Sequence, residues 1–268
     1  MISSKEHHLD HALRRAIPDG SNCLRILDAL LAEGDIRELH EYANIVSIRR
    51  LGFNDHGPVH MRQVAINAIR MLCLLRDAGI KTNLEAEESG TFDDSLCAVF
   101  MAAFTHDIGM AIGRDGHERM SVTLALPFID RVLAAVFPHE PHRRTAIRAT
   151  TIEGIIGHMG TQRIHSLEAG LILVADGCDM TKGRARIPIS LNTVPTVGDI
   201  HKYSANSIEK VLITEGAQRP ILIDVEMSAE VGFFQIEEVL IAKIESSPAK
   251  KHIELTAAVT GQTPKKYL

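Results

Sequence analysis

The dipeptide His106-Asp107 closes a long apolar segment, residues 95–105, that is typical of a buried helix. The C-terminus of a helix carries partial negative charge, so a carboxylate there is unfavourable unless a cation neutralises it. An imidazole nitrogen combined with a carboxylate oxygen suits Mn, Fe, Co, Ni or Zn better than calcium. The pair therefore predicts a divalent metal site at the end of this helix.

Other potential ligands lie at or near predicted helices on both sides of this pair. Asp176 is the most informative of them, because it follows the apolar residues 171–175 within a helix, where an unpaired carboxylate would be costly. In chain order, the candidate metal ligands are His60, His106, Asp107, His117, His158 and Asp176.

Each candidate also has an ordinary structural interpretation. His60 could pack or cap its helix, His117 could be a surface histidine at a helix start, and His158 could be an imidazolium stabilised by a helix C-terminus. His106-Asp107 itself could end a helix with a solvated carboxylate. The ordered set on helices favours a metal site over these separate interpretations.

The elements that must position these residues are helical up to Met180. Apolar spacing predicts helices over residues 21–33 and 35–50, with Ser21 and Asp35 as N-caps. Pro58 fits the first position of the helix that carries His60. Further helices are expected over residues 95–106, 115–137 with a kink at Pro127, 141–158 and 165–180.

From residue 187 the pattern changes to period two. Strands are expected over residues 208–213, 221–227 and 252–259, with a helix over 233–244 between the last two. We therefore predict a mainly α protein, with an all-α helical domain over residues 1–186 and a small α+β domain over 187–268. The order β-β-α-β should give a small sheet covered by one helix.

Composition sets limits on the partners and the compartment. With 268 residues, 45% of them hydrophobic, the chain can bury a core and still form a second, smaller domain. A formal net charge of -5 argues against a chain-wide surface for nucleic acid or anionic membrane, so we expect a small soluble partner. Four cysteines without a Cys-x-x-Cys motif, no long apolar segment and no apolar signal segment predict a soluble cytoplasmic protein.

The order His, His-Asp, His, His, Asp resembles the HD superfamily of metal-dependent phosphohydrolases. Three local contexts carry the resemblance: residues 60–65 (HMRQVA), residues 104–109 (FTHDIG), and Val174-Ala175-Asp176 followed by Asp179. The resemblance covers about residues 54–186 and implies an HD-type all-α domain. It does not extend to the C-terminal α+β domain.

Residue by residue, the resemblance implies two bound metal ions. The first would be bound by His60, His106, Asp107 and Asp176, and Asp107 would bridge to a second ion held by His117 and His158. His56 stands four residues before His60, where some dinuclear members such as the HD-GYP group have a carboxylate, and a Gly-Tyr-Pro motif is absent. Cyclic dinucleotide hydrolysis by the HD-GYP route is therefore not expected.

The resemblance implies hydrolysis of a phosphate ester, of a nucleotide or another small phosphorylated metabolite, by a metal-activated hydroxide. Asp107 would be catalytic through the metals, and Lys182 or Arg184 would offset charge on the phosphoryl oxygens, unless they belong to a solvated basic loop. His56, Asp179 and Arg186 would either orient a ligand or contact the substrate.

Two other functions stay open from the sequence. The same ligand order resembles the di-iron oxygenases of the HD fold, the myo-inositol oxygenase type, and the site could also belong to a nucleotide-sensing regulatory module. A short sheet with an exposed edge makes a homodimer plausible. Two groups of residues are expected on the surface without a role in the site: Arg143, Arg144 and Arg148, and His7, His8 and His11.

Overall fold

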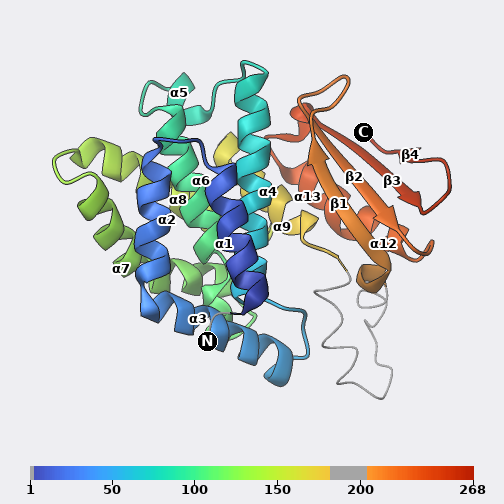
Figure 1. Cartoon of the computed structure of the whole chain (residues 1–268), viewed down its shortest axis with the longest axis horizontal. Coiled ribbons are helices and arrows are strands. Elements are labelled where there is room, and N and C mark those ends of the chain that lie inside the picture. The colour runs from blue at the N-terminus through green and yellow to red at the C-terminus, as the bar shows by residue number, and fades with distance from the viewer. Residues whose placement is uncertain (1–2, 182–203) are drawn as a thin grey trace.

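Helices dominate the protein, and a small sheet lies beside them in the computed structural model (Figure 1). The structure describes residues 3–181, here called the helical part, and residues 204–268, here called the C-terminal unit. The expectation of a mainly α protein with a small C-terminal sheet is confirmed. The expected domain boundary near Arg186 falls outside the described residues.

The helical part contains eleven elements whose bounds are as follows. They are α1 (Ser4–Ala16), α2 (Asn22–Ala32), α3 (Gly34–Ile45), the π-helix η1 (Val46–Arg50), α4 (Pro58–Asp77), α5 (Asn83–Ala86), α6 (Phe92–Thr105), the 3-10 helix η2 (Ile108–Ala111), α7 (His117–Val136), α8 (Pro141–Gly157) and α9 (Leu167–Cys178). The C-terminal unit contains β1 (Ile208–Thr214), β2 (Ile221–Met227), α12 (Gly232–Gln235), the π-helix η3 (Ile236–Leu240), α13 (Ile241–Ser246), the 3-10 helix η4 (Lys250–His252), β3 (Ile253–Val259) and β4 (Lys265–Lys266).

Side-chain caps start several of these helices, but not always at the expected residue. Ser21 caps α2 by accepting a hydrogen bond from the Cys23 backbone, as predicted. The prediction for Asp35 is wrong, because α3 begins one residue earlier and Asp35 lies in its first turn. Helix α1 was not expected, although Ser3 and Glu6 form a capping box at its start.

Helix α6 lies at the centre of the helical part. All of its residues from Asp94 to Thr105 are buried, and it packs against α2, α4, α8 and α9. Because α6 is apolar all round, it is stable only in such buried surroundings, and its C-terminal end can therefore hold side chains away from water. The neighbouring helix α7 continues across Pro127 without ending there.

The sheet has the strand order β1-β2-β3-β4. Strands β1 and β2 are antiparallel, β2 and β3 are parallel, and β3 and β4 are antiparallel. The parallel pair is connected by α12, η3 and α13, so the predicted order β-β-α-β is confirmed and the two-residue β4 is added to it. Alternate residues of β2, from Ile221 to Met227, are buried.

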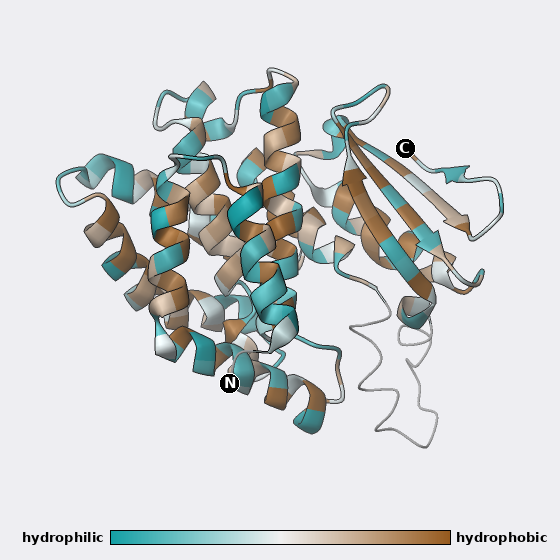
Figure 2. Ribbon diagram, in the orientation of Figure 1, coloured by the Kyte–Doolittle hydropathy of each residue, from teal (hydrophilic) through white to brown (hydrophobic). Residues whose placement is uncertain are grey.

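The sheet packs against the helical part through α4, and α13 packs against α9. Among the described residues, buried apolar side chains of both parts belong to one large cluster. Figure 2 shows hydrophobic residues along the strands and hydrophilic residues on the outer side of α1. The C-terminal unit is therefore held by the same core that surrounds α9.

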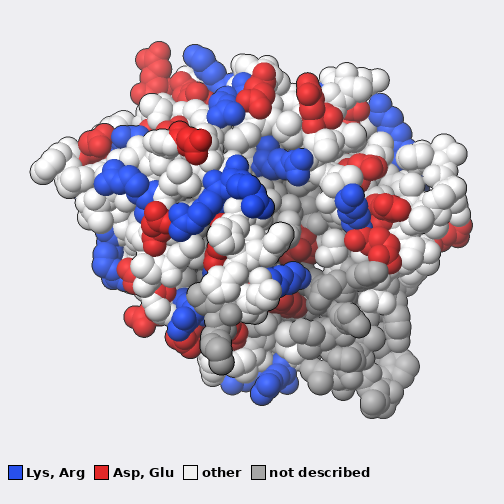
Figure 3. Space-filling model, in the orientation of Figure 1, with Lys and Arg blue, Asp and Glu red and all other residues white. Residues whose placement is uncertain are grey.

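The described residues include no helix that is long and apolar enough to cross a membrane. Figure 3 shows basic and acidic side chains interspersed over one face of the molecule. This agrees with the small formal net charge of -5.

Candidate metal centre

The six candidate ligands come from five helices and lie at or near their ends. His60 is in the first turn of α4, His117 is the first residue of α7, and Asp176 is in the last turn of α9. His106 and His158 directly follow α6 and α8. The structure brings all six together, and two groups of them could hold a metal ion: His60 with His106 and Asp176, and His106 with Asp107 and His158.

Close backbone approaches produce this convergence. Gly57 precedes α4, and a Cβ atom there would lie 2.7 Å from the side chain of Asn44. At Gly109 in η2, a Cβ atom would lie 2.1 Å from the carbonyl oxygen of His117. Only glycine fits such approaches. Gly109 also donates its backbone N–H to Ser121 Oγ, so η2 is fixed against the start of α7, beside Asp107.

Asp107 divides the centre into two halves. Its Oδ2 atom lies 3.3 Å from His60 Nε2 and 3.4 Å from His106 Nε2, and together with Asp176 these residues form the first half. Its Oδ1 atom lies 3.0 Å from His117 Nε2 and 3.1 Å from His158 Nε2, which form the second half. One buried carboxylate therefore faces two pairs of imidazoles, which adjoin each other because the ring centroids of His106 and His158 lie 4.7 Å apart.

Among the described histidines, Asp176 lies closest to those of the first half. Its Oδ1 atom lies 3.3 Å from His60 Nε2 and 3.8 Å from His106 Nε2. Its Oδ2 atom accepts a hydrogen bond from Lys243 Nζ at 2.5 Å. Burial alone would raise the pKa of Asp176, but Lys243 and the two imidazoles hold it well below its usual value, so the carboxylate is ionised.

The histidine rings are all oriented through Nδ1. His106, His117 and His158 donate Nδ1–H to the carbonyl oxygens of residues 103, 114 and 155, at 2.9, 2.8 and 2.6 Å. His60 donates Nδ1–H to Asp179 Oδ2 at 2.6 Å. A carbonyl oxygen can only accept, so these rings carry a proton on Nδ1, and a neutral ring then presents a lone pair at Nε2.

The Nε2 atoms point at one another across each half. His60 Nε2 lies 3.2 Å from His106 Nε2, and His117 Nε2 lies 3.1 Å from His158 Nε2. Asp107 Oδ1 is buried and receives no hydrogen bond of good geometry from the described residues. Facing lone pairs and an ionised carboxylate are favourable surroundings for a cation. These buried His and Asp groups could hold a metal ion, and the mixture of imidazole and carboxylate donors fits a divalent transition metal of unassigned identity.

The pKa values of the buried histidines differ between the two halves. Burial lowers the pKa of His158, which disfavours an imidazolium there. Burial also opposes charge on His106, but the neighbouring Asp107 carboxylate raises the pKa of His106 overall. Burial would raise the pKa of Asp107, yet the surrounding imidazoles hold it well below its usual value. The pKa values of His158 and His106 are therefore shifted in opposite directions.

The remaining predicted site residues have different outcomes. Asp179 contacts the centre through His60, as described above. His56 is buried, with Nδ1 bonded to the Asn54 carbonyl oxygen at 2.6 Å and Nε2 directed to Asp107 Oδ2 at 3.9 Å. The predicted residues Lys182, Arg184 and Arg186 lie outside the described residues.

Sequence reasoning missed two cations near the centre. Lys243 comes from α13, and its distance in sequence from Asp176 left no local signal. Arg114 precedes α7 by three residues, and its side chain lies 5.7 Å from the Phe53 ring centroid and donates to Met159 Sδ at 3.5 Å. The one available signal for Arg114 was its position three residues before His117.

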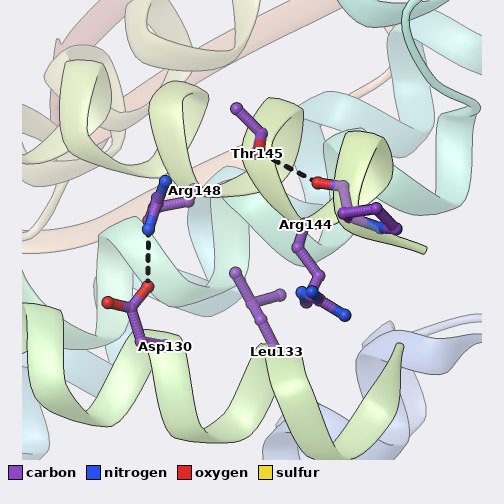
Figure 4. Close-up of a pocket in the computed structure, with 6 residues that line it drawn as sticks. Asp130, Leu133, Arg144, Thr145 and Arg148 are labelled. Carbon is purple, nitrogen blue, oxygen red and sulfur yellow. Dashed lines mark hydrogen bonds and ion pairs between the residues drawn. The ribbon is translucent and has the colours of Figure 1, made fainter. Parts of the chain in front are cut away.

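The basic residues of α8 lie apart from the centre. Arg144 and Arg148 line a hollow of about 260 Å³ between α7 and α8 (Figure 4). Arg148 is paired with Asp130 at 3.1 Å, and Arg144 donates to the carbonyl oxygen of Phe137 at 2.7 Å. Arg143 pairs with the buried Asp94 at 2.5 Å. His7, His8 and His11 are exposed, as expected.

The fold and site together define a mainly helical protein with a buried centre of histidine and aspartate. The chain is 40% identical over 241 residues to "Uncharacterized protein MJ1020" of Methanocaldococcus jannaschii, an alignment that covers 89% of this chain and 90% of that protein. It belongs to the same family as that archaeal protein. No family model matches the chain. No solved structure matches it either.

Proposed function

We propose that the protein is a dinuclear metal-dependent phosphohydrolase that cleaves the phosphate ester of a nucleotide or another small phosphorylated metabolite. The observation that carries the proposal is the division of Asp107, whose Oδ2 and Oδ1 atoms face two different pairs of imidazoles. A carboxylate shared in this way is the usual bridge of a two-metal site. The resemblance to the HD superfamily supplies the reaction class.

In such a centre, two divalent ions supply an activated water and offset charge on the phosphoryl oxygens. The ligand residues fix the positions that the two ions would occupy. His106, His117 and His158 are held by backbone carbonyls, so their rings cannot turn their donor side inward. Asp107 is only 2% exposed, which excludes bulk water from the charge at the middle of the centre.

His56 and Arg114 are the described side chains that we assign to the substrate. Because His56 Nδ1 is bonded to Asn54 and Ser47, its Nε2 atom faces the centre and can accept a proton or a hydrogen bond there. Arg114 contacts Phe53, which precedes His56 by three residues, and Met159, which directly follows His158. A guanidinium in this position is suited to a phosphate group.

The test is phosphate release from a panel of nucleotides and phosphomonoesters. The wild type is stripped of metal and reloaded separately with Mn, Fe, Co, Ni, Mg and Zn. We expect turnover with at least one metal, and a loss of at least about 10³-fold in Asp107→Ala, because both halves lose their shared ligand. The matched control is His142→Ala, which removes an exposed histidine of α8.

Two results would contradict the proposal. One is an Asp107→Ala variant that keeps wild-type turnover. The other is a wild type that binds metal but releases no phosphate from any substrate; oxygen uptake by the iron-loaded form would then favour an HD-fold oxygenase. Tight nucleotide binding without turnover would favour a sensing module instead.

A further inference from the structure

Lys243 connects the C-terminal unit to the metal centre. Its Nζ atom donates to Asp176 Oδ2 at 2.5 Å and to the carbonyl oxygen of His158 at 2.8 Å. Its side chain is only 13% exposed. The two acceptors belong to the last turn of α9 and to the residue that follows α8. One ammonium group therefore touches a ligand residue from each half of the centre.

The packing of α13 on α9 leaves space for this side chain. A Cβ atom at Gly177 would lie 3.0 Å from Lys243 Cδ, and one at Gly170 would lie 2.6 Å from Ser247 Oγ. Ser247 Oγ in turn donates to the Gly170 carbonyl oxygen at 3.0 Å. Because the two glycines are seven residues apart, they lie on one face of α9. The aliphatic stem of Lys243 runs along that face to Asp176.

The position of Lys243 is set by the fold of the C-terminal unit. Ile236, Leu240 and Ile244 precede and follow it on the same continuous helix and are completely buried. That helix is the connection between the parallel strands β2 and β3. All six candidate ligands lie in the helical part, so Lys243 is a contribution to the centre from outside it.

The charges at Asp176 place Lys243 in competition with a metal ion. The Asp176 carboxylate offers Oδ1 to His60 and His106, while Oδ2 is bonded to Lys243. A carboxylate buried in an apolar helix requires a cation, and Lys243 supplies one before any ion binds. An ion bound at Oδ1 would share the same carboxylate with the ammonium group, and the two cations repel each other.

We propose that Lys243 is a positioning residue that acts as an internal counter-ion: it holds Asp176 in place in the metal-free protein and lowers the affinity of the first half for its ion. The inference rests on the proposed metal centre. It gives the C-terminal unit a role, which is to set the ion affinity of a centre built entirely by the helical part.

The competition has a consequence that a purely structural ion pair lacks. Without the charge of Lys243, the metal-free protein loses a cation that contacts a buried carboxylate, whereas the metal-loaded protein has the ion in its place. The variant therefore loses more stability without metal than with it. Linkage then requires the ion to bind the variant more tightly than the wild type.

The experiment uses the full-length protein, stripped of metal with a chelator and titrated with Mn²⁺ and, separately, Zn²⁺ by calorimetry, with thermal unfolding measured with and without each ion. Lys243→Gln removes the charge but keeps hydrogen-bond donors, and Lys243→Arg keeps the charge. Lys250→Met is the matched control, because Lys250 pairs with Glu245 on the surface of the same unit. We expect Lys243→Gln to bind the first ion about tenfold more tightly, and the other two variants to resemble the wild type.

Each result of these titrations and unfolding measurements either supports or contradicts the role of Lys243. Equal or weaker binding in Lys243→Gln overturns the competition, as does an equal loss of thermal stability with and without metal. A Lys243→Gln variant that folds only when an ion is added supports it. A wild type that binds neither Mn²⁺ nor Zn²⁺ contradicts the metal centre itself, whereas a wild type that binds two ions beside an unchanged Lys243→Gln contradicts only the role of Lys243.

Discussion

The two halves of the proposed metal centre use the same kinds of side chain but differ in charge. The first half has two carboxylates, those of Asp107 and Asp176, and a third carboxylate behind His60 in Asp179. The second half has only the Oδ1 atom of Asp107, and its two imidazoles donate to carbonyl oxygens. The Glu118 carboxylate lies 3.4 Å from His117 Nδ1, which is farther than the 2.6 Å between Asp179 and His60 Nδ1. A carboxylate behind a ligand imidazole increases its basicity. The comparison therefore predicts two ions of unequal affinity, with the tighter ion in the first half.

The largest expected effect separates the halves directly. His158→Ala should lose the second ion and keep the first, so that the metal content falls from two ions per chain to about one. His106→Ala should instead weaken the first ion, because His106 Nε2 faces Asp107 Oδ2 and Asp176 Oδ1. Elemental analysis after gel filtration measures both variants. Equal losses in the two variants would show that the halves are not separate sites.

A smaller effect sharpens the role of the carboxylate behind His60. Asp179→Ala removes the acceptor that orients the ring through Nδ1 at 2.6 Å. We expect the affinity of the first ion to fall by about 10- to 100-fold while the second ion is unaffected. Competition with a chelator of known affinity measures the change. If the second ion were weakened to the same extent, Asp179 would support the fold rather than one half.

Arg114 should affect the substrate and neither ion. Arg114→Met leaves a long apolar side chain beside Met159 but removes the guanidinium. We expect KM for a phosphorylated substrate to rise about tenfold, the loss of one charge-assisted hydrogen bond, with the metal content unchanged. Arg119→Met, at an exposed position of α7, is the control. Unchanged KM would remove Arg114 from the substrate site.

His40, a buried histidine outside both halves, tests how burial alone affects the pH dependence of stability. Burial lowers the pKa of His40 to about 3, and its Nε2 atom bonds the Phe104 carbonyl oxygen at 2.8 Å. The folded state therefore resists protonation that the unfolded chain accepts below about pH 6.5. The stability that the neutral ring contributes is complete above that pH and is lost as the pH falls toward 3.

Chelator-treated wild type and His40→Gln should accordingly differ in pH dependence. Between about pH 6 and pH 4, the free energy of unfolding of the wild type should fall more steeply, by up to about 1.4 kcal/mol per pH unit. Urea unfolding at a series of pH values measures the slope. Parallel slopes would mean that His40 is not held neutral in the folded protein.

The sequence predicted helices and strands most accurately where the spacing of apolar residues matches the side chains that are buried in the fold. The apolar segment before His106 and the alternating residues 221–227 gave the central helix and strand β2 with nearly the right bounds. Helix α1 was missed because its apolar face is narrow, with Leu9 and Leu13 among polar neighbours. The start of α3 was misplaced because Asp35 is also favourable within a first turn.

Asp107 and Asp176 could be predicted because a carboxylate in or after an apolar helix conflicts with its surroundings. His60, His117 and His158 were predicted from their order in the chain, which resembles the HD superfamily. The contacts that orient these ligands could not be predicted. The Nδ1 bonds are made to backbone carbonyls of residues 103, 114 and 155, which any sequence can supply. Lys243 reaches Asp176 from another unit, and only the packing of α13 on Gly177 brings it there.

The most direct test of the centre is the number of ions bound by the wild type. The protein is stripped with a chelator, reloaded with Mn²⁺ or Zn²⁺, freed of excess ion by gel filtration and analysed for metal per chain. The division of Asp107 between two pairs of imidazoles predicts two ions, bound with different affinities. A single ion at saturation, or none, would contradict the dinuclear centre.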